Sequence, residues 1–158
     1  MLQLTKRTEY GLIALVHLVD RDGEFVSARE IGEAYPVPKR LLAEVLKDLS
    51  RAGLVESQRG ATGGYALARP ADAVYLGEVI AAVEGAPSLT GCDSLGAFNS
   101  GSCDVSPVCP IKNPMQRVRI GIWDLLQRTS LRDLASPRGM ADLSAITSTS
   151  TSTGPHDN

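Results

Sequence analysis

The sequence predicts a mainly α-helical fold with a small β-hairpin wing and a long C-terminal helix. Two segments before residue 53 repeat apolar side chains at helical spacing, and a capping sequence between them begins a further helix. A glycine-tipped pair of short strands follows, and an amphipathic helix ends near residue 129. With 158 residues and 43% apolar side chains, the chain is long enough for one core and too short for two large ones. We therefore expect one globular unit with a protruding helix.

The first half of the chain predicts three helices joined by short turns. Apolar residues recur every three to four positions over residues 7–20, which indicates the first helix. Ser27 and Glu30 have the spacing of a capping box, in which each side chain bonds the other residue's backbone amide, so a second helix begins there. It ends near Pro36, where two prolines predict a tight turn. A third helix starts at Lys39, and Gly53 stands where a left-handed residue often ends a helix.

The second half adds a hairpin and two more helices. Residues 54–59 and 65–69 are predicted strands joined by a glycine-rich loop, which completes the order of a winged helix-turn-helix. Helices are expected over residues 76–84 and about 111–129. The second of these has an apolar stripe, which we expect to pack against another element or chain. The stripe consists of Val118, Ile122, Leu125 and Leu126, with Trp123 beside it. We predict four regions: a winged helix-turn-helix DNA-binding domain (1–84), a cysteine loop (85–110), a dimerisation helix with its following segment (111–135), and a disordered tail (136–158).

Net charge does not by itself indicate the partner. The formal charge is −2, but residues 1–69 hold ten basic and nine acidic side chains against six and nine in the rest. Local placement of basic residues must therefore decide whether DNA is bound. No run of eighteen apolar residues occurs, and the N-terminus enters a charged amphipathic pattern instead of a signal-peptide core. We expect a cytoplasmic protein with no membrane partner.

Two groups of residues are candidate contacts to double-stranded DNA. Lys39 and Arg40 begin the third helix, whose N-terminal residues face base edges in this fold. The alternative is that both are ordinary solvated surface. Arg59 precedes a loop whose glycines allow close approach to another molecule, as contact with a minor groove requires. The alternatives for this loop are a plain hairpin turn or a nucleotide site, but the lysine and hydroxyl residue of the P-loop are absent. The expected wing contacts are Arg59, Gly60, Thr62 and Gly63.

Four stretches of the chain resemble the Rrf2 family of transcription regulators. They are Leu-Thr-Lys-Arg-Thr-Glu-Tyr-Gly-Leu, Ala-Gly-Leu-Val-Glu-Ser-Gln-Arg-Gly, Gly-Gly-Tyr-Ala-Leu and Gly-Glu-Val-Ile-Ala-Ala-Val-Glu-Gly. The resemblance covers residues 2 to about 135 and implies a homodimer, held by the long C-terminal helix, on a palindromic operator. Arg59 is similar to the family's wing arginine. Some members have an acidic residue where this chain has Ala43, so operator preference is not transferred.

The three cysteines lie within eighteen residues of one another. Cys92 and Cys103 are separated by ten residues, and Cys103 and Cys109 by five, in a segment rich in glycine. Thiolates are soft ligands that suit iron, and cluster-binding members of the family show gaps of five and five, so the first gap is longer here. A longer loop costs little closure entropy. We predict an iron–sulfur cluster (2Fe-2S or 4Fe-4S); a redox-active thiol site, zinc or inert cysteines are the alternatives.

Three cysteines leave a fourth ligand to be assigned. One branch of the family uses a histidine three residues after the last cysteine, and that position here is Lys112, which does not suit iron. In the nitric-oxide-sensing branch an aspartate of the partner's first helix serves, and the resemblance implies Glu9 of the partner subunit. Glu9 equally suits a purely structural role at a helix start. His17 is interpreted as a partly buried helix residue.

These observations predict a DNA-binding regulator, expected to be a repressor, whose DNA affinity depends on the cluster as a sensor of redox state, nitric oxide or iron–sulfur status. A cluster-free thiol regulator and an iron–sulfur electron-transfer protein are the rivals. We expect no enzyme, because the chain has only two histidines, one of them in the tail, and shows no Ser/His/Asp constellation.

Overall fold

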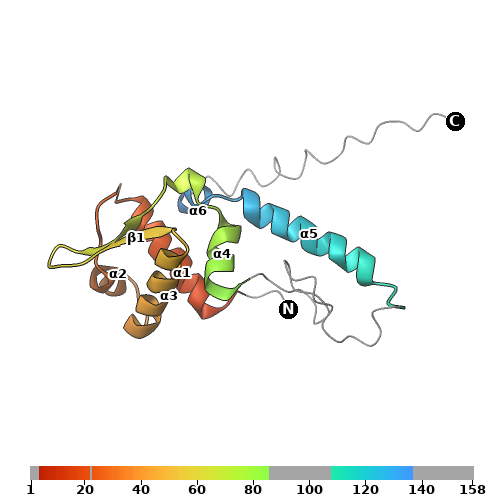
Figure 1. The fold of residues 1–158 in the computed structure, drawn as a ribbon, viewed down its shortest axis with the longest axis horizontal. Coiled ribbons are helices and arrows are strands. Elements are labelled where there is room, and N and C mark those ends of the chain that lie inside the picture. The colour runs from red at the N-terminus through yellow and green to blue at the C-terminus, as the bar shows by residue number, and fades with distance from the viewer. Residues whose placement is uncertain (1–3, 22, 86–107, 137–158) are drawn as a thin grey trace.

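A body of short helices and a two-stranded hairpin carries one long helix, α5, that extends away from it (Figure 1). The computed structural model describes residues 4–21, 23–85 and 108–136. The predicted fold class is confirmed, and the helices and strands lie close to their expected positions. In chain order they are α1 (Lys6–Val19), α2 (Ala28–Ala34), α3 (Lys39–Arg51), β1 (Val55–Gln58), β2 (Gly64–Leu67), the 3-10 turn η1 (Ala71–Ala73), α4 (Leu76–Glu84), α5 (Lys112–Arg128) and α6 (Leu131–Ala135).

Side-chain caps begin the first two helices. Thr5 accepts from the amide of Thr8 at the start of α1, and Ser27 Oγ accepts from the amide of Glu30 at 3.1 Å at the start of α2. The second half of the predicted capping box is not formed. Glu30 Oε1 instead lies 3.1 Å from Arg21 Nη2, because a cation within reach attracts the carboxylate more strongly than a neutral amide does.

Helix α3 ends as its sequence predicts. Gly53 has a φ of +70°, which a side chain with a Cβ rarely adopts. The amide of Leu54 donates to the Leu49 carbonyl at 3.0 Å, and the amide of Gly53 donates to the Ser50 carbonyl at 3.1 Å. These two bonds form a Schellman motif, so the chain leaves α3 in a fixed direction and enters β1.

The core lies between α1, α3 and α4, and the short α6 closes it. One face of α3 is almost fully buried, while its other face carries the charged residues described below. A helix with one apolar face must bury that face against other elements, and this requirement fixes the rotation of α3 about its axis. Residues of the core that are at most 2% exposed include Leu15, Leu18, Ile31, Leu42, Val45, Leu46, Leu49 and Ile80.

The hairpin is attached to the body at its base. Strands β1 and β2 pair antiparallel in a register that places Val55 opposite Leu67 and Gln58 opposite Gly64. Val26, just before α2, exchanges two backbone hydrogen bonds of 2.9 and 2.8 Å with Tyr65. A Cβ on Gly64 would overlap the carbonyl group of Val26, so this approach requires glycine. The base of the wing is therefore held against the helix-turn-helix.

The chain returns to the body after α5 and forms α6, a helix that the sequence analysis did not predict. The Leu131 amide donates to the Val74 carbonyl at 2.7 Å, and the Leu76 amide donates to the Thr129 carbonyl at 2.9 Å. Leu131 is 1% exposed within the core. A helix of five residues is too short to show periodicity, and these tertiary contacts stabilise it instead. None of the described helices is long and apolar enough to cross a membrane.

Candidate nucleic-acid interface and cysteine segment

The outer face of α3 carries an exposed row of residues, three of which are charged. Arg40, Ala43, Glu44 and Lys47 follow one another at steps of three, one and three residues and are all exposed. Arg40 Nε lies 3.2 Å from Glu44 Oε1, and the Arg40 side chain is 93% exposed. Such an exposed pair is worth little, so phosphate or a base edge can replace the carboxylate. Sequence reasoning missed Lys47, although its spacing of seven residues from Arg40 places both on one helix face.

The N-terminus of α3 also has free donors. Its first residue is Lys39, which is exposed, and the preceding N-cap residue is Pro38, whose side chain cannot accept a hydrogen bond. The first amides of the helix therefore have no side-chain cap within the described structure. Together with the positive end of the helix dipole, they favour an anionic partner.

The tip of the wing projects beyond its paired strands. Arg59, Gly60, Ala61 and Thr62 are exposed, whereas Gly63 is half-buried. Gly60 has a φ of +117°, and its carbonyl accepts from the Gly63 amide at 3.1 Å, which closes the turn. The hairpin lies on the side of the body opposite to α5 in Figure 1. The candidate DNA contacts of the wing thus extend from a base that the body holds in place.

Glu9 lies in the first turn of α1, as the ligand hypothesis requires, but it already has a partner. Its carboxylate is 2.5 Å from Lys6 Nζ, and its side chain is 37% exposed. The hydrogen bond and the negative charge of Glu9 raise the pKa of Lys6 above its ordinary value. Glu9 is therefore accessible to a second molecule once this surface pair opens. His17, two turns further on, is partly buried and packs edge-on against the Tyr35 ring at a centroid distance of 5.6 Å.

Only the last of the three cysteines falls within the described residues. Cys92 and Cys103 lie outside them. Cys109 is partly exposed and is a free thiol, and its carbonyl accepts from the Lys112 amide at 3.4 Å at the start of α5. No group of three or more His, Cys, Asp or Glu side chains that could hold a metal occurs in the described part of the chain. The structure therefore places one predicted ligand, directly before the long helix.

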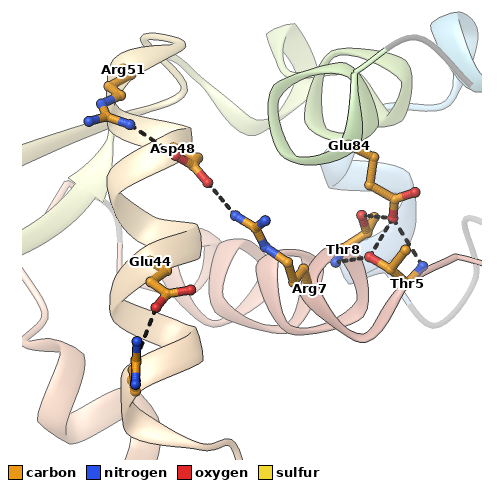
Figure 2. Close-up of polar contacts among 8 residues, drawn as sticks. Thr5, Arg7, Thr8, Glu44, Asp48, Arg51 and Glu84 are labelled. Carbon is orange, nitrogen blue, oxygen red and sulfur yellow. Dashed lines mark hydrogen bonds and ion pairs between the residues drawn. The ribbon is translucent and has the colours of Figure 1, made fainter.

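A polar network that sequence reasoning missed connects α4, α1 and α3 (Figure 2). Glu84, the last residue of α4, accepts at Oε1 from the Thr5 amide at 3.0 Å, from Thr5 Oγ1 at 2.7 Å and from Thr8 Oγ1. One residue before Thr8, Arg7 Nη2 donates to Asp48 Oδ2 on α3 at 2.6 Å. The bonded residues are 41 to 79 positions apart, so no local pattern could show that they meet.

The environment of Glu84 favours its charged form. Burial raises the pKa of this carboxyl, but hydrogen bonds from Thr8 and Thr5 and the positive charge of Arg7 together lower it more. The pKa therefore lies below its ordinary value of 4.5. The carboxylate also faces the N-terminus of α1, where the helix dipole stabilises negative charge.

Because the pKa of Glu84 is lower in the folded state, its contribution to stability is present above about pH 4.5 and is lost as the pH falls through the folded-state value. We expect Glu84→Gln to be less stable than wild type at pH 7 and the difference to shrink below pH 4. Urea unfolding of both proteins at pH 7, 5 and 3.5 measures this. A difference that stays constant over this range would contradict the assignment.

The long helix α5 exposes apolar side chains. Val118 is 52% exposed, Ile120 is 53% exposed and Ile111 is 60% exposed. Within the predicted stripe, Ile122, Leu125 and Leu126 are half-buried. Ile111 and Val118, seven residues apart, are in line with this stripe, whereas Ile120 lies on the opposite face of the helix. Exposed apolar side chains aligned on a protruding helix are typical of a protein–protein contact.

These features define a winged-helix fold, with a helix-turn-helix, a hairpin wing and a long C-terminal helix. The family model described as "Iron-dependent Transcriptional regulator", Rrf2, matches residues 4–137, so the chain belongs to the Rrf2 family. Solved structures similar to it include CymR of B. subtilis, described as the global cysteine regulator, with 28% identity, a TM-score of 0.65 and coverage of 85% of this chain and 97% of that one. The oxidized form of S. aureus CymR has 27% identity, a TM-score of 0.65 and the same coverage. IscR of T. potens has 27% identity, a TM-score of 0.59 and coverage of 84% and 85%.

Proposed function

We propose that this Rrf2 regulator is a cytoplasmic homodimeric repressor that binds a palindromic DNA operator. Helix α3 enters the major groove with Lys39 and Arg40, and the wing contacts the adjacent DNA through Arg59, Gly60, Thr62 and Gly63. The observation that carries the proposal is the division of α3 into two faces. Its apolar face is locked in the core, so its charged face and its uncapped N-terminus point outward in a fixed orientation.

The second copy of the chain is proposed to bind along α5. Val118 and Ile111 are exposed and lie seven residues apart, in line with the half-buried Ile122 and Leu125. Two such helices packed together remove this apolar surface from water. A two-fold dimer presents two copies of α3, which a palindromic operator requires.

Cys92, Cys103 and Cys109 are proposed to hold an iron–sulfur cluster, with Glu9 of the partner subunit as the fourth ligand. The donor set fits: three thiolates suit iron, and a carboxylate is a weaker ligand that a sensor can exchange. Glu9 is accessible on α1, and Cys109 lies directly before α5. When bound, the cluster would supply a group that responds to redox state, nitric oxide or iron supply. Cys109 would then connect the bound group to the helix that we assign to dimerisation.

A second candidate is a regulator that senses by thiol chemistry without iron. The likeness to CymR, whose S. aureus structure is described as an oxidized form, favours it. Cys109 is partly exposed, as a reactive thiol must be. Metal content separates the two candidates.

Replacing Arg59 with alanine is expected to weaken specific DNA binding by roughly tenfold to a hundredfold, the range for loss of one arginine contact to a base. The probe is a duplex selected by the wild-type protein from a random pool, titrated at fixed salt. Arg128→Ala removes the same charge from α5, where the side chain is 50% exposed, and serves as the matched control. Equal binding by Arg59→Ala and Arg128→Ala would overturn the assigned role of the wing.

Anaerobic purification followed by a visible spectrum and assays of iron and acid-labile sulfide tests the cofactor. We expect a coloured protein with stoichiometric sulfide, loss of colour in Cys109→Ala and faster loss of iron under oxygen in Glu9→Ala. Asp133→Ala, which removes the carboxylate that caps α6, is the control for Glu9. Protein that stays free of iron after anaerobic reconstitution would favour the thiol regulator.

A further inference from the structure

Arg7 interacts with carboxylates of two different helices, through an ion pair with Asp48 on α3 and through its charge with Glu84 on α4; Figure 2 shows its guanidinium turned toward Asp48. Its Nη2 donates to Asp48 Oδ2 of α3 at 2.6 Å. Its positive charge acts on Glu84 at the end of α4 and lowers the pKa of that carboxyl. Arg7 Nε is buried and makes no hydrogen bond with the described residues, so the contact to Asp48 orients the guanidinium.

Glu84 fixes the first turn of α1 to the end of α4. Its Oε1 accepts three hydrogen bonds from Thr5 and Thr8, which are the N-cap residue of α1 and a residue of its first turn. Arg7 belongs to this same turn. Any displacement of the end of α4, where the chain enters the cysteine segment, therefore displaces the backbone that carries Arg7.

Asp48 connects this turn to the helix that we assign to DNA recognition. It lies in the last turns of α3, next to Lys47 in sequence, and also pairs with Arg51 at 3.3 Å. The Asp48 side chain is 23% exposed, which makes this contact less screened than the surface pairs elsewhere on the helices. Because a helix moves largely as a rigid body, a displacement of Asp48 also displaces the exposed residues on the outer face of α3.

We propose that Arg7 is a positioning residue for α3, which transmits the position of Glu84 to Asp48 and so sets the angle at which α3 meets DNA. This inference deepens the proposed function, since it rests on α3 being the recognition helix. It assigns the coupling to two sets of polar contacts, the three hydrogen bonds from the first turn of α1 to Glu84 and the ion pair of Arg7 with Asp48. The apolar core between α1 and α3 holds the helices together but does not involve Glu84.

The test is a double-mutant cycle read by hydrogen–deuterium exchange of the full-length protein. Glu84→Gln keeps the shape of the side chain and removes its charge. We expect it to raise the exchange rates of amides in residues 45–51 by roughly three- to tenfold, as for residues that share one network. In an Arg7→Gln background the same change is expected to leave α3 unaffected. An equal effect of Glu84→Gln with and without Arg7, or an effect confined to α1 and α4, would overturn the proposal.

Three further variants keep the outcome decisive. Asp48→Asn breaks the same contact from α3 and replaces Arg7→Gln in the cycle if the latter does not fold, with Arg51→Gln as a control for the second ion pair of Asp48. Glu33→Gln removes an exposed pair of 2.7 Å on α2 and is expected to leave exchange in α3 unchanged. Exchange reports the coupling without DNA. If Glu84→Gln changes exchange in α3 only when Arg7 is present, but the protein binds no selected duplex, the proposed function alone is contradicted. If the protein binds DNA normally but exchange in α3 does not depend on Arg7 in this way, this inference alone is contradicted.

Discussion

Replacing Leu46 with alanine is expected to lower the free energy of unfolding by about 2–5 kcal/mol, the range for deleting a buried leucine side chain. Leu46 is 0% exposed and lies on the face of α3 that packs in the core. The cavity would open directly behind the exposed recognition face. Since domains of this size are stable by about 5–15 kcal/mol, much of the margin would be lost.

Urea unfolding at pH 7 measures the effect of Leu46→Ala. Lys47→Ala is the matched control, because the neighbouring side chain is exposed on the outer face of the same helix. We expect Lys47→Ala to change stability by at most about 0.5 kcal/mol and to weaken DNA binding. A stability loss below about 1 kcal/mol in Leu46→Ala would show that the inner face of α3 is packed differently from the description above.

Replacing Val118 with aspartate is expected to separate the dimer and to reduce binding to a palindromic duplex by about a hundredfold or more. Val118 is 52% exposed, so the change does not disturb the core of a single chain. A charge placed in an apolar contact costs several kcal/mol of association free energy, because it loses water without gaining a partner. A single subunit then holds only one half-site and loses the effective concentration that the second provides.

Sedimentation velocity, with unfolding as a check of the single chain, measures this second effect. Gln116→Asp introduces the same charge on an exposed position of α5 that lies off the apolar stripe. It is expected to leave the oligomeric state unchanged. A Val118→Asp protein that remains a dimer, or a wild type that is a monomer at micromolar concentration, would contradict the assignment of α5 to dimerisation.

Local sequence patterns predicted most of the fold because the signals are local. The end of α3 illustrates this: Gly53 follows an apolar stripe and supplies the left-handed residue, and the structure shows that conformation. The wing was likewise indicated by glycines between two short strands. Such elements are specified by neighbours within a few residues, so a single sequence contains the information.

Contacts between distant residues were not predictable in the same way. Glu84 is an ordinary helix-end acid in the sequence, and only folding brings it to Thr5, 79 positions away. Glu30 has the spacing of a capping box, yet the fold offers it Arg21. Helix α6 exists because Leu131 enters the core and pairs with the chain at Val74. In each case a tertiary partner decides among several locally acceptable arrangements.

Helix α5 is attached to the body at its C-terminal end, because the chain returns to the body directly after it. Backbone bonds of Thr129 and Leu131 pin its C-terminal end to the body, and Cys109 precedes its other end. With 17 residues, the helix is about 25 Å long. By simple trigonometry, a tilt of about 5° at the attached end sweeps the far end through roughly 2 Å. A small rotation at the attached end would therefore produce a larger displacement at the end that follows Cys109.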